Sequence, residues 1–151
     1  MNRVLLSLVL SLLVACHTGA AQAGEVQRAG QPIVVYKAPS CGCCAGWVDY
    51  LQKRGFQVTV HDRADLSDIK ARYGIRAELR SCHTAVVDGY AIEGHVPADD
   101  IWRLLEERPR ITGLTAPGMP LMSPGMNSIE PKGYDVLSFD AEGGSAVVSR
   151  Y

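Results

Sequence analysis

The sequence predicts one exported α/β domain in which short strands alternate with amphipathic helices. Three observations support this fold class. An uncharged apolar run stands near the N-terminus, β-branched stretches alternate with segments of helical spacing, and three cysteines stand where the first helix should begin. Without the apolar leader about 125 residues remain, enough for one compact domain.

The leader has the features of a secretory signal. Residues 4–15 are apolar, follow an arginine, and are too few to span a bilayer. Two cleavage signals compete: "LVAC", ending at Cys16, resembles a bacterial lipobox, and "AQA", residues 21–23, resembles an ordinary signal-peptidase site. We expect a signal peptide over residues 1–23, with cleavage and lipid attachment at Cys16 as the alternative. Both predict a periplasmic protein, which would be an outer-membrane lipoprotein in the second case.

The first half of the domain alternates strand and helix. "PIVVYKA", residues 32–38, predicts a buried strand, and a helix follows from Ser40 to Gly55. The helix is indicated by apolar positions at i, i+3, i+4 and i+7, namely Cys44, Trp47, Val48 and Leu51. "FQVTVH", residues 56–61, alternates as a strand does, and a short helix is expected over residues 66–73.

The second half predicts two hairpins around one helix. "TAVVDGYAIEG" gives two strands about Asp88-Gly89, a type I′ turn signal. A helix is expected from Pro97 to Arg108. "YDVLSFD" and "SAVVSRY" then predict a C-terminal hairpin, whose last strand lies in residues 141–151.

A Met-, Pro- and Gly-rich stretch over residues 112–133 shows neither helical nor strand period. Loops of this length in small domains are usually functional or disordered. Because strands are expected on both sides, we predict a loop tied at both ends, within a metal-binding domain over residues 30–140.

The element order is β-α-β-α-β-β-α, with a cysteine motif at the start of the first helix. This is the thioredoxin-like, three-layer α/β arrangement. The charge of the chain is nearly balanced, with 15 basic and 16 acidic residues and no basic cluster, which argues against nucleic acid as a partner.

The motif "CGCC" permits three readings: a redox dithiol, a metal site or a structural disulfide. Cys41 and Cys44 share a helix face, and a helix N-terminus favours thiolate. A disulfide between these two is geometrically ordinary, whereas one between the adjacent Cys43 and Cys44 would be strained. The spacing alone does not choose among the three readings.

A second group of soft ligands precedes the third strand. In a thioredoxin-like fold, this loop lies against the start of the first helix, and thioredoxins keep a proline there. The sequence has no proline between Pro39 and Pro97, and Cys82 and His83 stand in the loop instead. Both are good ligands for soft metals, so we expect Cys82 to face the first motif. The alternatives are a buried small residue at Cys82 and a hydrogen-bonded loop histidine.

Two further features bear on metal binding. His95 follows the fourth strand and stands either near the site or at the cap of the last helix. Met119, Met122 and Met126 offer thioethers, which favour Cu(I). Single methionines often fill gaps, but three in eight residues favour a lid that carries metal ligands.

Four segments in order, "YKAPSCGCCAGW", "SCHTAVVDGYAIEGHVPADDI", "RLLEERP" and "GLTAPGMPLMSPGM", resemble the CopG-type copper-resistance proteins, small exported thioredoxin-fold metal-binding proteins. The resemblance runs from Ile33 to Phe139. It implies a multinuclear Cu(I) cluster on cysteine thiolates and a part in periplasmic copper resistance, with Cu(II) as a further state. Met122 departs from the pattern, where glycine is expected.

The expected metal ligands are Cys41, Cys43, Cys44, Cys82, His83, His95, Met119 and Met126. The expected partners are copper ions and other periplasmic copper-handling proteins, and we expect a monomer. We expect a metal-binding protein in the first place; if the protein is an enzyme, we expect a copper oxidoreductase that converts copper between its redox states, or a thiol oxidoreductase. The alternative is a thiol-disulfide oxidoreductase that uses Cys41 and Cys44; a four-thiolate zinc site and an Fe–S cluster rank lower.

Overall fold

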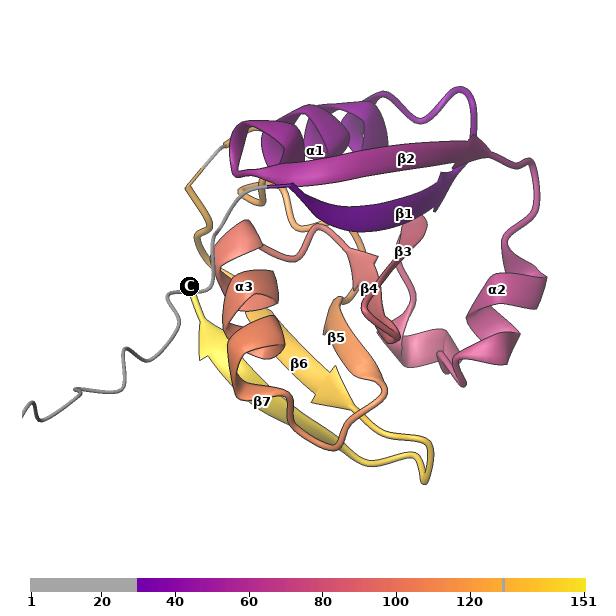
Figure 1. The fold of residues 1–151 in the computed structure, drawn as a ribbon, viewed down its shortest axis with the longest axis vertical. Helices are drawn as coiled ribbons and strands as arrows, with labels where there is room; N and C mark the ends of the chain where they lie inside the picture. Colours follow the sequence, from indigo (N-terminus) through magenta and orange to yellow (C-terminus); the bar gives the residue numbers. More distant parts are fainter. Residues whose placement is uncertain (1–29, 129) are drawn as a thin grey trace, which may run out of the picture.

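A seven-stranded mixed sheet runs through the computed structural model, which describes residues 30–128 and 130–151 (Figure 1). Its strands are β1 (Gln31–Lys37), β2 (Phe56–Asp62), β3 (His83–Val87), β4 (Tyr90–Gly94), β5 (Gly113–Ala116), β6 (Asp135–Phe139) and β7 (Ser145–Arg150). The helices are α1 (Gly42–Lys53), α2 (Ser67–Arg72), α3 (Ala98–Glu107) and the short 3₁₀ helix η1 (Ala77–Leu79). The predictions for residues 1–23 and Cys16 lie outside the described residues.

The strand order across the sheet is β2-β1-β3-β4-β5-β6-β7. β1 pairs parallel with β2 and antiparallel with β3, and β3 and β4 form the expected hairpin. Its turn residues Asp88 and Gly89 have φ angles of 46° and 86°, as a type I′ turn requires. The mixed α/β class is therefore confirmed.

The sheet has seven strands where the sequence predicted six. The additional strand is β5, which opens the stretch expected to be loop and pairs parallel with β4 and antiparallel with β6. All four of its residues are buried. A strand that is covered on both faces shows no alternation, so the segment gave no periodic signal. Gly113 is needed there, because a Cβ would overlap the carbonyl oxygen of Ala91.

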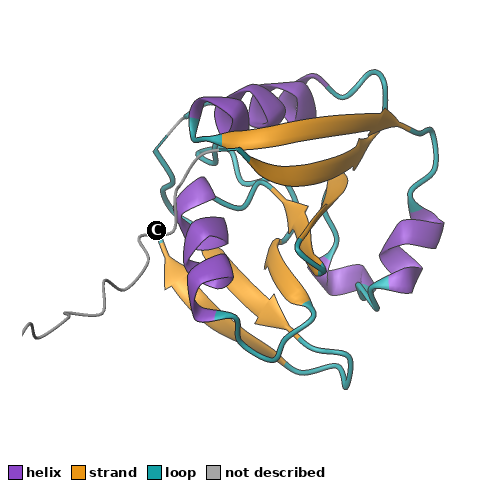
Figure 2. Cartoon of the chain, viewed as in Figure 1, coloured by secondary structure: helices purple, strands orange, loops and turns teal. Residues whose placement is uncertain are grey.

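Helices lie on both faces of the sheet (Figure 2). Adjacent residues of β4 show the division: Ile92 belongs to the large core under α1 and α3, and Ala91 to a smaller cluster with Leu79 of η1. No helix within residues 30–128 and 130–151 is long and apolar enough to cross a membrane.

The two large helices are tied to each other through their tryptophans. Trp47 of α1 donates its ring N–H to the carbonyl of Val96 at 2.9 Å, and Trp102 of α3 donates to the carbonyl of Arg54 at 3.2 Å. Trp102 also stacks on Phe56 with ring centroids 4.3 Å apart. These contacts hold the middle of α1 against the segment after β4, and the C-terminal end of α1 against α3.

The segment between β5 and β6, residues 117–134, packs on α1 through two glycines. A Cβ on Gly46 would meet the Gly125 carbonyl oxygen at 2.9 Å, and a Cβ on Gly125 would overlap the backbone of Trp47. Gly125 also has a φ of +85°, in the region that favours glycine. The loop backbone therefore lies directly against the helix that bears the cysteines.

The C-terminus closes onto α3 around a buried carboxylate. Asp100 is 1% exposed, and it accepts hydrogen bonds from Tyr151 Oη at 2.8 Å and Ser149 Oγ at 2.6 Å. Arg103 also pairs with it. The chain end in Figure 1 accordingly lies beside α3.

Candidate metal centre

The first cysteines stand at the N-terminus of α1. Cys41 is the N-cap residue, and its carbonyl accepts the N–H of Ala45 at 3.2 Å. A turn before it is closed by a hydrogen bond from the Cys41 N–H to the Ala38 carbonyl at 3.1 Å. Cys41 and Cys44 form a disulfide, so the site is in an oxidised form.

Cys82, just before β3, completes the sulfur group. Its Sγ lies 3.4 Å from Cys44 Sγ, and Cys43 Sγ lies 3.6 Å from Cys41 Sγ. All four sulfurs are within 4.8 Å of one another. The structure thus brings Cys82 to the first motif across a separation of 38 residues.

Two buried histidines flank Cys82. Its Sγ lies 3.4 Å from His83 Nδ1 and 3.3 Å from His95 Nε2. His95 lies at the site rather than at the helix cap, because the N-cap of α3 is Pro97.

A backbone carbonyl sets the tautomer of His95. Its Nδ1 is 2.7 Å from the oxygen of Pro124, and a carbonyl can only accept, so Nδ1 carries the proton. The lone pair on Nε2 then faces Cys82. Metal-binding histidines commonly show this arrangement, in which the second ring nitrogen is fixed by a carbonyl.

Burial keeps these groups uncharged. Burial first, and the neighbouring Cys43 second, raise the pKa of Cys82 to about 11. Burial likewise lowers the pKa of His83 and His95, so both rings are neutral at neutral pH. Neutral imidazole is the form that binds a metal, and a bound cation would favour the cysteine thiolate.

A buried ion pair that was not predicted from the sequence holds the backbone before Cys82. Glu93 of β4 is 0% exposed; it meets Lys70 Nζ at 2.5 Å, the Thr84 hydroxyl at 2.6 Å and the Ser81 N–H at 2.6 Å. Lys70 also donates to the Ser81 carbonyl at 3.2 Å. The signal that could have found it is the glutamate within the buried strand "YAIEG".

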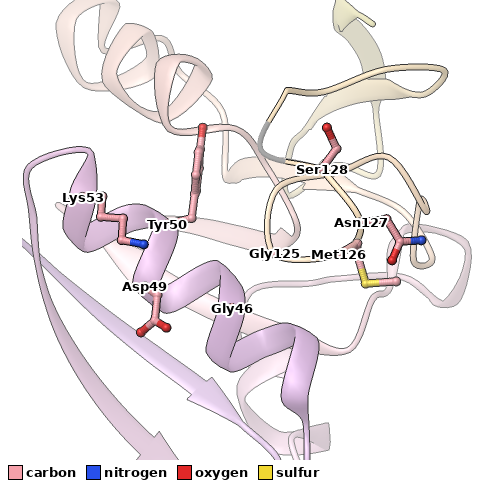
Figure 3. Close-up of a pocket in the computed structure, with 8 residues that line it drawn as sticks. All are labelled: Gly46, Asp49, Tyr50, Lys53, Gly125, Met126, Asn127 and Ser128. Atoms are coloured by element: carbon pink, nitrogen blue, oxygen red, sulfur yellow. The ribbon is translucent and has the colours of Figure 1, made fainter.

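The methionines lie in two different places. Met119, 59% exposed, lines an open cavity of about 310 Å³ together with Cys82. Met126 lines a pocket of about 600 Å³ between α1 and the loop, shown in Figure 3 with Tyr50 and Lys53 on its helical side. Met122 is 42% exposed. Met119 therefore shares a cavity with a site cysteine.

Fold and site together define a small α/β protein with a cluster of cysteines, flanked by histidines, that could hold a metal. A solved structure titled "Copper resistance protein copG- Form 1" is 41% identical, covers 81% of this chain and 98% of its own, and superposes with a TM-score of 0.75. A second, titled "Form 2", gives the same values. The chain belongs to the family of CopG copper-resistance proteins.

The family profile described as "Protein of unknown function, DUF411" matches residues 79–126. That segment contains Cys82, both site histidines and the methionines of the loop. A comparison with curated proteins found no match.

Proposed function

We propose that the chain is an exported copper-binding protein that holds a multinuclear Cu(I) cluster on Cys41, Cys43, Cys44 and Cys82 and takes part in periplasmic copper resistance. The observation that supports this most directly is the convergence of four sulfurs within 4.8 Å. Thiolates favour Cu(I). The family relationship supports copper in particular.

A cluster suits this site better than a single ion. Cys43 and Cys44 are adjacent in sequence, which makes it hard to aim both sulfurs at one tetrahedral centre, whereas each can bridge two metals. Cys41 and Cys44 become ligands only after their disulfide is reduced. His83 and His95 supply neutral imidazole beside Cys82.

The proposed fold is thioredoxin-like in the segment from β1 to α3. The strand order β2-β1-β3-β4, the parallel β1–β2 pair and the cysteines at the start of α1 support it. Strands β5 to β7 extend this unit. The proposed location is the periplasm, on the basis of the apolar leader in residues 4–15.

Reduced protein should bind more than one Cu(I) per chain. Anaerobic titration against a competing Cu(I) chelator, with thiols counted in the same sample, measures this. Saturation at one ion, or equal binding by protein with alkylated thiols, would contradict the cluster.

Cys82→Ser separates the copper proposal from a simple dithiol. We expect copper loading to fall sharply, because the sulfur at 3.4 Å from Cys44 is removed while the Cys41–Cys44 pair stays intact. The Cys41–Cys44 pair should still be able to form and break its disulfide. Normal copper loading by the variant would contradict the copper site and favour thiol-disulfide exchange by Cys41 and Cys44 as the function.

The methionine loop is proposed as a lid. Replacing Met119 and Met126 with leucine keeps the apolar volume and removes the thioethers. We expect faster transfer of Cu(I) to a chelator with an unchanged circular dichroism spectrum. Met122→Leu is the comparison variant. An unchanged rate of Cu(I) transfer in the double variant would show that these methionines only pack against their neighbours.

A thiol-disulfide oxidoreductase is the second candidate function, favoured by the disulfide at the N-terminus of α1. Cys44 is fully buried and Cys41 partly exposed, an arrangement in which an outer sulfur can meet another disulfide. Disulfide reduction by metal-free protein, abolished by Cys41→Ser, would support it.

A further inference from the structure

The oxidised site contains a third sulfur in contact with its disulfide. Cys82 is a free thiol, and its Sγ lies 3.4 Å from Cys44 Sγ, the inner sulfur of the Cys41–Cys44 bond. Thiol–disulfide exchange needs a thiolate close to a disulfide sulfur. Here one chain provides the disulfide, the thiol of Cys82 and a base beside that thiol, with no external oxidant or reductant.

We propose that Cys82 exchanges with the disulfide inside the folded chain, which moves the bond from Cys41–Cys44 to Cys44–Cys82. Cys82 Sγ bonds to Cys44 Sγ as the Cys41–Cys44 bond breaks. The proton of the Cys82 thiol passes to His95 Nε2, and Cys41 leaves as a thiolate. Once His95 has released this proton to solvent and the exposed Cys41 thiolate has taken one up, one disulfide and two free thiols are present, as before the step, so no electrons enter or leave.

The surroundings of Cys82 suit this step. His95 Nε2 lies 3.3 Å from Cys82 Sγ and is the unprotonated ring nitrogen, because Nδ1 donates to the Pro124 carbonyl. A nucleophile beside a base that is itself oriented by a third group is the usual arrangement for activating a thiol.

The product differs from the starting form in what it presents to solvent. After exchange the bond joins the buried Cys44 to Cys82, and the free thiols are Cys41 and Cys43. In the form with the Cys41–Cys44 bond, both residues are partly exposed and their sulfurs lie 3.6 Å apart. The oxidised chain can thereby offer a pair of neighbouring thiols at the rim of the site to an incoming soft metal or a partner disulfide. The exchange does not depend on bound copper.

Trapping with N-ethylmaleimide tests the exchange in oxidised, metal-free protein. In a Cys16→Ser/Cys43→Ser chain, the alkylating agent labels either Cys82, with the original disulfide intact, or Cys41, which locks the exchanged form. Trypsin distinguishes the two, because Cys41 and Cys44 share peptide 38–53 and Cys82 lies in peptide 81–103. Only the exchanged form links the two peptides.

We expect the linked pair, with the label on Cys41 by fragmentation. Label only on Cys82 would overturn the exchange, and label on Cys44 would overturn its direction. The wild-type chain should give the same linkage with labels on both Cys41 and Cys43, which guards against misfolding of the variant. The Cys82→Ser variant cannot form this linkage, so it measures the background signal for linked peptides. Because no copper is present, failure here would leave the copper proposal standing.

The role of His95 as proton acceptor is tested by the ratio of the two trapped forms, the one with the original disulfide and the one with the linked peptides. His95→Gln should lower the share of linked peptide at least ten-fold, because general-base assistance typically contributes about 10²–10⁴-fold in rate. His61→Gln, on the exposed edge strand β2, is the matched control and should leave the partition unchanged. Equal partition in both variants would overturn the role of His95.

Discussion

At the scale of single residues, Lys70 and Glu93 show how a buried charge pair positions the site. Their contacts all converge on the backbone of Ser81 and on Thr84, on either side of Cys82 and His83. Burial raises the pKa of Glu93, and the charge of Lys70 opposes that shift. The buried Glu93 carboxylate therefore depends on the charge of Lys70.

Lys70→Met should destabilise the reduced, metal-free chain by about 3–5 kcal/mol, because it leaves Glu93 buried without its partner. Urea denaturation measures this. Lys37→Met is the matched control: its lysine is equally buried, but its partner Asp62 is 53% exposed, so we expect a loss of about 1 kcal/mol or less. Lys70→Met/Glu93→Gln should recover part of the loss, and equal losses in both single variants would contradict this account.

At the scale of elements, the sequence predicted those with a clear period or turn signal. The strand starting at Pro32, the helix through Trp47 and the Asp88-Gly89 hairpin all appear within a few residues of their expected bounds. β5 was missed because a strand that is buried on both faces shows no alternation of apolar and polar residues. Its first residue, Gly113, is also of a type that is common in loops.

The site shows the same limit. Residue types and spacing were enough to expect Cys82 opposite Cys44 once a topology was assumed. The placement of His95 was left open, because its neighbours depend on Pro124, which belongs to a loop without periodic signal. Glu93 was missed because a single acid in a strand does not reveal a partner on a distant helix.

Gly125→Ala should detach the loop from α1, because a Cβ there would overlap the backbone of Trp47. Gly118→Ala is the matched control: its φ is also positive, at +70°, but a Cβ would meet nothing within 4 Å. Both substitutions carry a backbone penalty of about 1–2 kcal/mol. We expect a larger fall in melting temperature and faster tryptic cleavage after Lys132 for Gly125→Ala. Equal behaviour of the two variants would contradict the packing role.

At the scale of the whole molecule, the C-terminus makes stability sensitive to alkaline pH. Burial raises the pKa of Tyr134 and Tyr151, whose rings lie 5.5 Å apart, and the hydrogen bond to Asp100 raises that of Tyr151 further. Unfolded phenols titrate near pH 10. Above that pH the unfolded chain releases protons that the folded chain keeps, so the free energy of unfolding falls as pH rises.

Tyr134→Phe/Tyr151→Phe should flatten this fall. The double variant loses the Tyr151 hydrogen bond and is less stable at pH 8, but its melting temperature should decline less steeply between about pH 10 and 11. Differential scanning calorimetry across that range measures the two slopes. Parallel slopes would show that other groups cause the alkaline loss.

The antiparallel pairing of β5 with β6 has a consequence for how the chain can vary. Residues 117–134 leave the sheet after β5 and return to it at the neighbouring strand β6. They are therefore a hairpin connection, and the pairing of the two strands does not require a particular loop length. The entropy of closing such a connection rises only with the logarithm of its length, by about 0.6 kcal/mol for each doubling. Insertions and deletions near the exposed Leu121 can therefore accumulate at small cost to folding. Those that spare Pro124 and Gly125 would also leave the histidine and helix contacts in place, so the rim of the site can be lengthened or shortened while its base is retained.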